Sequence, residues 1–193
     1  MQRHWDDVAH LLRILAWIVK KSDGDGLELY YSMSSDQVHS KKSSVLVDDL
    51  KRREPYGQSD ISGALGRILS KYQHQLDESA GSRTRFDPFI RHPFRPMTVY
   101  VFTDAVWRPN CDGARPIVSM IEKLQSLGIP NDSQQIGIQF ISFGNDQTCL
   151  DKLAYLEGEL KKKYGRDIVD TEPSYGNVWK MFLGSINGYF DEG

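Results

Sequence analysis

Apolar positions recur along the chain with two different periods, and the two periods predict alternating helices and strands. Spacings of three and four residues predict amphipathic helices at 8–19, 45–53, 61–75, 115–127, 147–164 and from 178 onward. Short runs rich in strand-forming residues predict strands at 27–32, 97–102, 135–143 and 167–170. The polar stretch 34–44 predicts a loop or a weak edge strand.

The order of these elements predicts one domain, 1–193, of the α/β class. Alternating helices and strands indicate a doubly wound, Rossmann-like, mostly parallel sheet with helices on both faces. The run Met97–Phe102 is nearly apolar throughout, which predicts a strand buried on both faces of that sheet. Residues 77–96 interrupt the pattern with polar residues and three prolines, so they predict a long surface loop or insertion.

Composition narrows the classes of function. The chain has 39% apolar and 26% charged residues and a formal charge of −2, which gives no reason to expect nucleic acid or an anionic membrane as partner. No run of about 18 apolar residues exists, and the N-terminus does not resemble a signal peptide. The cysteines, Cys111 and Cys149, are too few for a disulfide scaffold or a zinc site. They predict free thiols and a cytoplasmic protein.

Two polar features lie where an open α/β sheet binds ligands. Thr103 and Asp104 directly follow the apolar strand, and residues 57–60 directly precede a helix. Ser59 or Asp60 is also a natural N-cap, because its oxygen can accept from the amides of the first helical turn. Asp104 could likewise be a carboxylate that stabilises a turn rather than one that binds a ligand. Both interpretations stay open on these residues alone.

Together these residues resemble the von Willebrand factor type A (vWA) domain. Thr103-Asp104 looks like that family's strand-end Thr-Asp, and 57–61 looks like its Gly-x-Thr-x-hydrophobic loop. The closer similarity is to a fungal, intracellular branch of the family. Three stretches carry it, namely Tyr100–Trp107, Gly137–Asp146 and Arg166–Thr171.

The resemblance implies a metal-ion-dependent adhesion site. In the family, an Asp-x-Ser-x-Ser strand, a Thr and an Asp hold hydrated magnesium, which accepts a carboxylate from a protein partner. Here the implied ligands are Ser59, in place of the Thr, and Asp104; Ala105 stands where the family usually has Gly. No Asp-x-Ser-x-Ser occurs near the start of the chain. We therefore expect a vestigial site and magnesium binding that is about millimolar or weaker, or absent.

Because Asp-x-Ser-x-Ser does not occur near the start of the chain, the resemblance also implies that the first central strand of the vWA sheet is missing. In the family that strand lies between the strands corresponding to 27–32 and 97–102. Its absence predicts unpaired backbone groups on both neighbours, at about 1–3 kcal/mol for each buried one. We therefore interpret 1–193 as an N-terminally truncated domain, and expect added upstream residues to sharpen its thermal transition.

The function implied is a non-catalytic protein-binding module of the adhesion or scaffold type, with Trp107 and Asp60 as partner-contacting residues. For Trp107, packing against a neighbouring helix is the alternative. Another alternative for the whole chain is a metal-free structural remnant or gene fragment without a dedicated ligand. A small phosphotransfer or hydrolase-type enzyme is a third, but the sequence contains no phosphate loop, dinucleotide loop or nucleophile elbow.

Overall fold

The computed structural model describes residues 1–21, 23–82, 95–131 and 133–183. A 3-10 turn, Gln2–His4, precedes the first helix. The remaining elements follow in the order α1 (Trp5–Val19), β1 (Leu27–Tyr30), β2 (Gln37–Ser40), α2 (Ser43–Lys51), α3 (Ile61–Ser82), β3 (Met97–Thr103), α4 (Ala114–Ser126), β4 (Ile136–Ser142), α5 (Gln147–Tyr164), β5 (Val169–Pro173) and α6 (Val178–Leu183).

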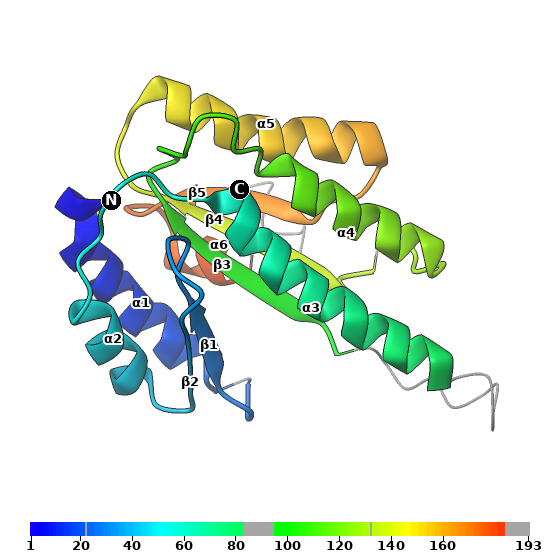
Figure 1. Ribbon diagram of the computed structural model, residues 1–193, viewed down its shortest axis with the longest axis horizontal. Coiled ribbons are helices and arrows are strands. Elements are labelled where there is room, and N and C mark those ends of the chain that lie inside the picture. The colour runs from blue at the N-terminus through cyan, green and yellow to red at the C-terminus, as the bar shows by residue number, and fades with distance from the viewer. Residues whose placement is uncertain (22, 83–94, 132, 184–193) are drawn as a thin grey trace.

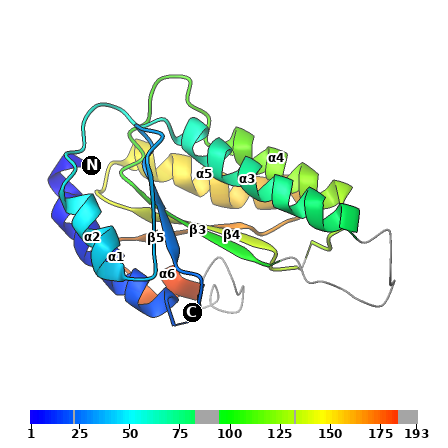
Figure 2. The same cartoon turned by 60° about the horizontal axis from the view of Figure 1, so that its bottom comes forward.

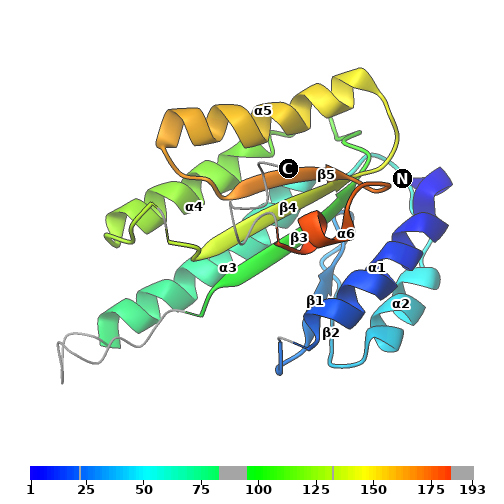
Figure 3. The same cartoon turned by 180° about the vertical axis from the view of Figure 1, so that it is seen from behind.

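Three layers make up the fold, and a parallel sheet in the order β3-β4-β5 forms the middle one (Figure 2). Buried apolar residues of α3, α4 and α5 form one core with the sheet. Those of α1 and α2, with Met181 of α6, form a second core on the opposite face (Figure 3). The predicted α/β class, with a parallel sheet covered by helices on both faces, is confirmed.

The strands β1 and β2 form a separate antiparallel hairpin beside this sheet (Figure 1). Arg95, just before β3, pairs with Asp23 and Asp25, just before β1. At the other end, Arg108 Nη2 lies 3.9 Å from Met33 Sδ, so the loops that follow the two strands also meet. Within the described residues, β1 therefore runs alongside β3 in the same direction without joining its sheet.

Burial differs sharply between β3 and β4. All seven residues of β4 are buried, because β4 lies between two strands and two helical layers. Only Val99 and Thr103 of β3 are buried. The prediction that Met97–Phe102 is buried on both faces holds in part: Met97, Val99 and Val101 pack with one core, and Tyr100 and Phe102 pack with the other, but only Val99 of this run is fully buried.

Most predicted elements lie within a few residues of the observed ones. The N-terminal apolar stripe faces the core as helix α1, with Val8, Leu11 and Leu15 buried. The helix α3 continues to Ser82 and so occupies the first six residues of the predicted 77–96 loop. Residues 83–94 of that loop, and 184–193 beyond α6, lie outside the described residues. No described helix is long and apolar enough to cross a membrane.

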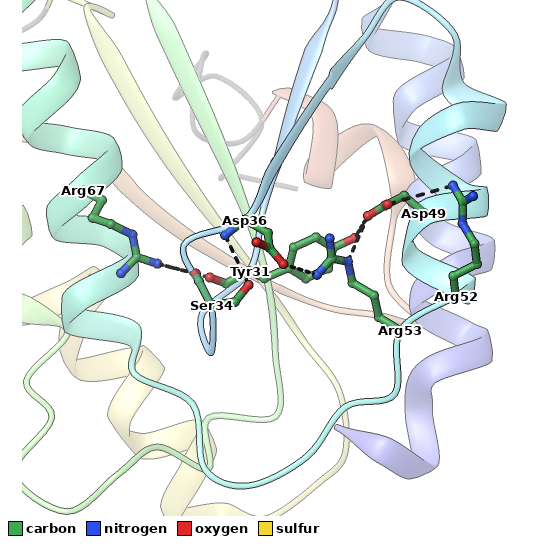
Figure 4. A network of polar contacts seen from close by, with 7 residues as sticks. All are labelled: Tyr31, Ser34, Asp36, Asp49, Arg52, Arg53 and Arg67. Atoms are coloured by element: carbon green, nitrogen blue, oxygen red, sulfur yellow. Dashed lines mark hydrogen bonds and ion pairs between the residues drawn. The ribbon is translucent and has the colours of Figure 1, made fainter.

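Polar contacts fasten the hairpin to the helices on both sides (Figure 4). The Tyr31 hydroxyl donates to Asp49 Oδ2 of α2 at 2.8 Å, and the Arg53 guanidinium lies 4.0 Å from the centre of the Tyr31 ring. Arg53 also donates to Asp36 at 2.7 Å and to Asp49 at 3.0 Å. From α3, Arg67 donates to the carbonyl oxygen of Tyr31 at 3.2 Å. Hydrogen bonds and ion pairs therefore connect the hairpin to both helical layers.

Candidate functional site

The parallel strands β3, β4 and β5 end at one edge of the sheet, where ligands of open α/β sheets bind. Two loops meet beside the end of β3, which we name the Ser59 loop (57–60) and the Asp104 loop (104–108). Ser59 forms a parallel bridge with Trp107, and Arg108 N donates to Ser59 O at 3.1 Å. The Ser59 hydroxyl lies 3.5 Å from the carbonyl oxygen of Val106. The structure thus joins the two loops that the sequence singled out.

Both predicted metal ligands make contacts with the protein itself. Asp104 Oδ1 accepts from the amide of Val106 at 3.2 Å, and Oδ2 pairs with the amino group of Met1. The Asp104 side chain is 13% exposed. The Ser59 hydroxyl is directed toward Val106. Metal binding at this edge would have to displace some of these contacts.

The residues at this edge fit a complete magnesium site poorly. Magnesium prefers six oxygen ligands in octahedral geometry and gives up its water reluctantly. Asp104 and Ser59 supply one carboxylate and one hydroxyl. Among the described residues, no group of three or more His, Cys, Asp or Glu side chains is placed to hold a metal ion.

Asp60, a predicted partner contact, caps helix α3. Its Oδ1 accepts from the amide of Gly63 at 2.8 Å, and this hydrogen bond holds the pKa of the Asp60 carboxyl below its usual value. The Cys111 thiol lies 3.5 Å from the same oxygen. The capping alternative considered for Asp60 is therefore realised, and partner contact by Asp60 stays a prediction.

Trp107 is half-buried and held in a fixed orientation. Its Nε1 donates to Thr103 Oγ1 at 3.1 Å, and the same hydroxyl accepts from the amide of Ala105 at 2.9 Å. Ala105 has φ 52°, in the left-handed region that favours glycine, so it turns the chain sharply after Asp104. One side of Trp107 packs against the core of α3, α4 and α5. Trp107 therefore packs against the core, as the alternative to partner contact predicted. The rest of its indole surface is accessible.

An open hollow with a volume of about 500 Å³ lies beside Trp107. It is bounded by the segment before α4 on one side and by the first half of α5 on the other. Its lining includes Trp107, Cys111, Asp112, Gly113, Asp151 and Tyr155. Tyr155 is 56% exposed, so most of its ring is accessible at the wall of this hollow.

Sequence reasoning missed the α5 side of this hollow. Asp151 and Tyr155 are four residues apart and therefore share one face of a helix. An aromatic residue on a face otherwise rich in charge was the available signal. What the sequence did not show is that this face approaches the loop after β3.

The two cysteines are free and half-buried, in agreement with the prediction of free thiols. Burial, together with the neighbouring Asp146 carboxylate, raises the pKa of the Cys149 thiol. A raised pKa keeps that thiol protonated near neutral pH and so disfavours a nucleophilic role for it.

Comparisons of the chain with protein-family models, with curated proteins and with solved structures found no match. The vWA resemblance therefore stays a prediction that rests on the residues quoted for it.

Proposed function

We propose that the chain is a non-catalytic, vWA-like protein-binding module whose binding face is the carboxyl edge of the parallel sheet. The observation that carries this proposal is the junction of the Ser59 loop with the Asp104 loop at that edge. These are the loops that present the partner-binding site in the family. A hollow with accessible aromatic surface adjoins them, which is typical of protein interfaces.

The separation of the two sheets supports the finer part of the proposal, a vWA sheet without its first central strand. In the family order, one strand parallel to both neighbours lies between those equivalent to β1 and β3. Here β1 runs alongside β3, with their ends connected through Arg95 and Arg108, yet the strands share no ladder. A missing central strand would leave this arrangement.

The metal site in this proposal is degenerate, so the module captures its protein partner mainly without magnesium. Asp104 Oδ2 would have to give up its pairing with the Met1 amino group before it could coordinate a cation, whereas Oδ1 could keep the Val106 amide. We expect magnesium to bind at about millimolar concentration or weaker. The rival function, a structural remnant without a ligand, is favoured by the same engagement of Asp104 within the chain.

Manganese provides the test, because its unpaired electrons broaden the nuclear magnetic resonance (NMR) signals of nearby amides. We expect about millimolar manganese to broaden the amides of Ser59 and of 104–107 first. Asp104→Asn should remove this effect, whereas the matched control Asp48→Asn, on the exposed face of α2, should retain it.

Micromolar or tighter binding would contradict a degenerate site. Broadening that is unchanged by Asp104→Asn would contradict the assignment of these loops. No broadening of these loops at any concentration would mean that the edge holds no metal, and would contradict even the weak site proposed here.

A further inference from the structure

We propose that the hollow beside Trp107 binds a lysine or arginine side chain of a protein partner. This inference rests on the proposed protein-binding function and specifies its ligand chemistry. It concerns a different part of the same edge from Ser59 and Asp104, on the side that faces α5.

The hollow is formed before any partner arrives. Trp107 is fixed by its hydrogen bond to Thr103 Oγ1, and helix α5 carries Tyr155 on the opposite side. Gly113 adds no side chain to the lining, and a Cβ there would make ordinary contacts of 3.6 Å with the Trp107 ring and with Leu156. Preformed aromatic walls lose little conformational freedom on binding.

The charge of the lining favours a cation. Asp112 and Asp151 are both exposed and come from opposite sides of the hollow. Asp112 Oδ1 accepts from the amide of Ala114 at 2.9 Å, and Asp151 Oδ1 accepts from Gln147 at 2.8 Å. A carboxylate accepts about four hydrogen bonds, so each retains capacity for a ligand.

Lys152, the single cation among the described residues of the lining, already contacts other groups of the chain. Its Nζ donates to the carbonyl oxygen of Ala105 at 3.3 Å and lies 5.7 Å from the centre of the Trp107 ring. The indole therefore already faces one ammonium group, as aromatic faces do for cations. Two carboxylates against one ammonium leave the hollow with a net negative charge, which an acidic side chain would not match.

The alkyl stem of a lysine or arginine side chain can pack against the aromatic walls, while its charged end meets the carboxylates. Such stems pack along apolar surface while the head group reaches polar partners. A purely apolar side chain would leave two carboxylates partly desolvated without compensation. The combination of aromatic walls with carboxylates from two elements thus favours a basic side chain over either alternative.

Three capped pentapeptides, Gly-Gly-X-Gly-Gly with X as arginine, norleucine or glutamate, test this inference. Binding is followed through the NMR signals of the Trp107 indole and the Tyr155 ring. We expect the arginine peptide to bind about fivefold or more tightly than the other two, with both signals shifting.

The double variant Asp112→Asn/Asp151→Asn removes both charges but keeps an acceptor oxygen for Ala114 and Gln147. It should reduce arginine-peptide binding about fivefold or more, whereas the control Asp48→Asn should leave it unchanged. The variant Tyr155→Ala, at an exposed position, should weaken binding as well.

Failure of the inference differs from failure of the proposed function. Equal binding of all three peptides, binding of none, or arginine binding that survives the double variant would overturn the cation site. Preferred binding of the glutamate peptide that requires both added magnesium and Asp104 would also overturn it, yet would support the proposed module. The manganese titration reads out the Ser59 and Asp104 loops independently of this hollow.

Discussion

All seven residues of β4 are buried, whereas neither strand of the β1–β2 hairpin has a fully buried residue. The parallel sheet is stabilised chiefly by apolar surface removed from water, which contributes about 25 cal/mol per Å². The hairpin packs only partly buried apolar side chains against the second core, and exposed or half-buried contacts such as Lys71–Glu28 and Tyr31–Asp49 add to its hold. Exposed ion pairs contribute about 0–1 kcal/mol each. The comparison teaches that the two sheets should differ in stability and in their response to acid.

The largest expected effect comes from a matched pair of substitutions that remove the same number of carbon atoms. Ile138→Ala in β4, at a fully buried position, should lower the free energy of unfolding by about 2–5 kcal/mol. Leu29→Ala in β1, at a half-buried position, should lower it by about 1–2 kcal/mol. Urea unfolding followed by circular dichroism measures both. Equal losses would contradict the difference between the two sheets.

Gln139 is a buried polar residue in the middle of strand β4, and its replacement by an apolar residue should stabilise the protein. The side chain is 0% exposed, and neither its amide nitrogen nor its amide oxygen has a hydrogen-bond partner among the described residues. An unsatisfied buried polar group costs about 1–3 kcal/mol, and methionine is of similar size. Gln139→Met should therefore raise the free energy of unfolding by about 1–3 kcal/mol in the same urea experiment. A decrease would mean that the amide has a partner in solution, such as a buried water molecule.

Tyr31→Phe should loosen the hairpin while leaving the parallel sheet intact. The substitution removes the 2.8 Å hydrogen bond to Asp49 but keeps the ring beneath the Arg53 guanidinium. We expect a loss of about 1 kcal/mol, confined to local opening of 27–40. Amide hydrogen exchange resolved by residue measures this opening. If the amides of β4 accelerate to the same extent, the hairpin is not a separate unit of stability.

Acid should release the hairpin before it unfolds the sheet. The hydrogen bond from Arg53 lowers the pKa of the exposed Asp36 carboxyl. Burial raises the pKa of Asp49, but hydrogen bonds from Tyr31 and Arg53 outweigh it, so that this pKa is lowered as well. Because both carboxyls have lower pKa values in the folded state, their stabilisation is present above about pH 4 and is lost as pH falls through the folded values. NMR shifts of 27–40 should change over this range before those of β4, and less so in Asp36→Asn.

The regular elements could be predicted because their patterns are local. The apolar spacing in 8–19 and 115–127 marked the buried faces of α1 and α4, and Gly128, with φ 64°, follows the end of α4. The position of β3 at the edge of the described parallel sheet could not be predicted in the same way. A run such as Met97–Phe102 has the same composition whether it pairs on both sides or on one, and only the sheet order decides this.

In the candidate site too, residues marked by a local pattern could be predicted, and residues that depend on tertiary packing could not. Ser59, Asp104 and Trp107 were found because they directly precede a helix or follow a strand, where polar residues of α/β proteins gather. Tyr155 and Asp151 were missed because their role depends on how closely α5 approaches the loop after β3. The pairing of Met1 with Asp104 joins residues 103 positions apart, which no local pattern predicts.

Hydrogen exchange along β3 is the most direct test of the central structural claim, that no described strand pairs with the edge of β3 that faces β1. Met97 N donates to Gln135 O, and Thr103 O accepts from Phe143 N, so the odd-numbered residues of β3 face β4. The amides of Thr98, Tyr100 and Phe102 therefore face the hairpin. We predict that these three exchange much faster than the amides of Val99 and Val101. Equal protection along the whole of β3 would contradict the claim, because it would mean that another segment pairs with this edge in solution.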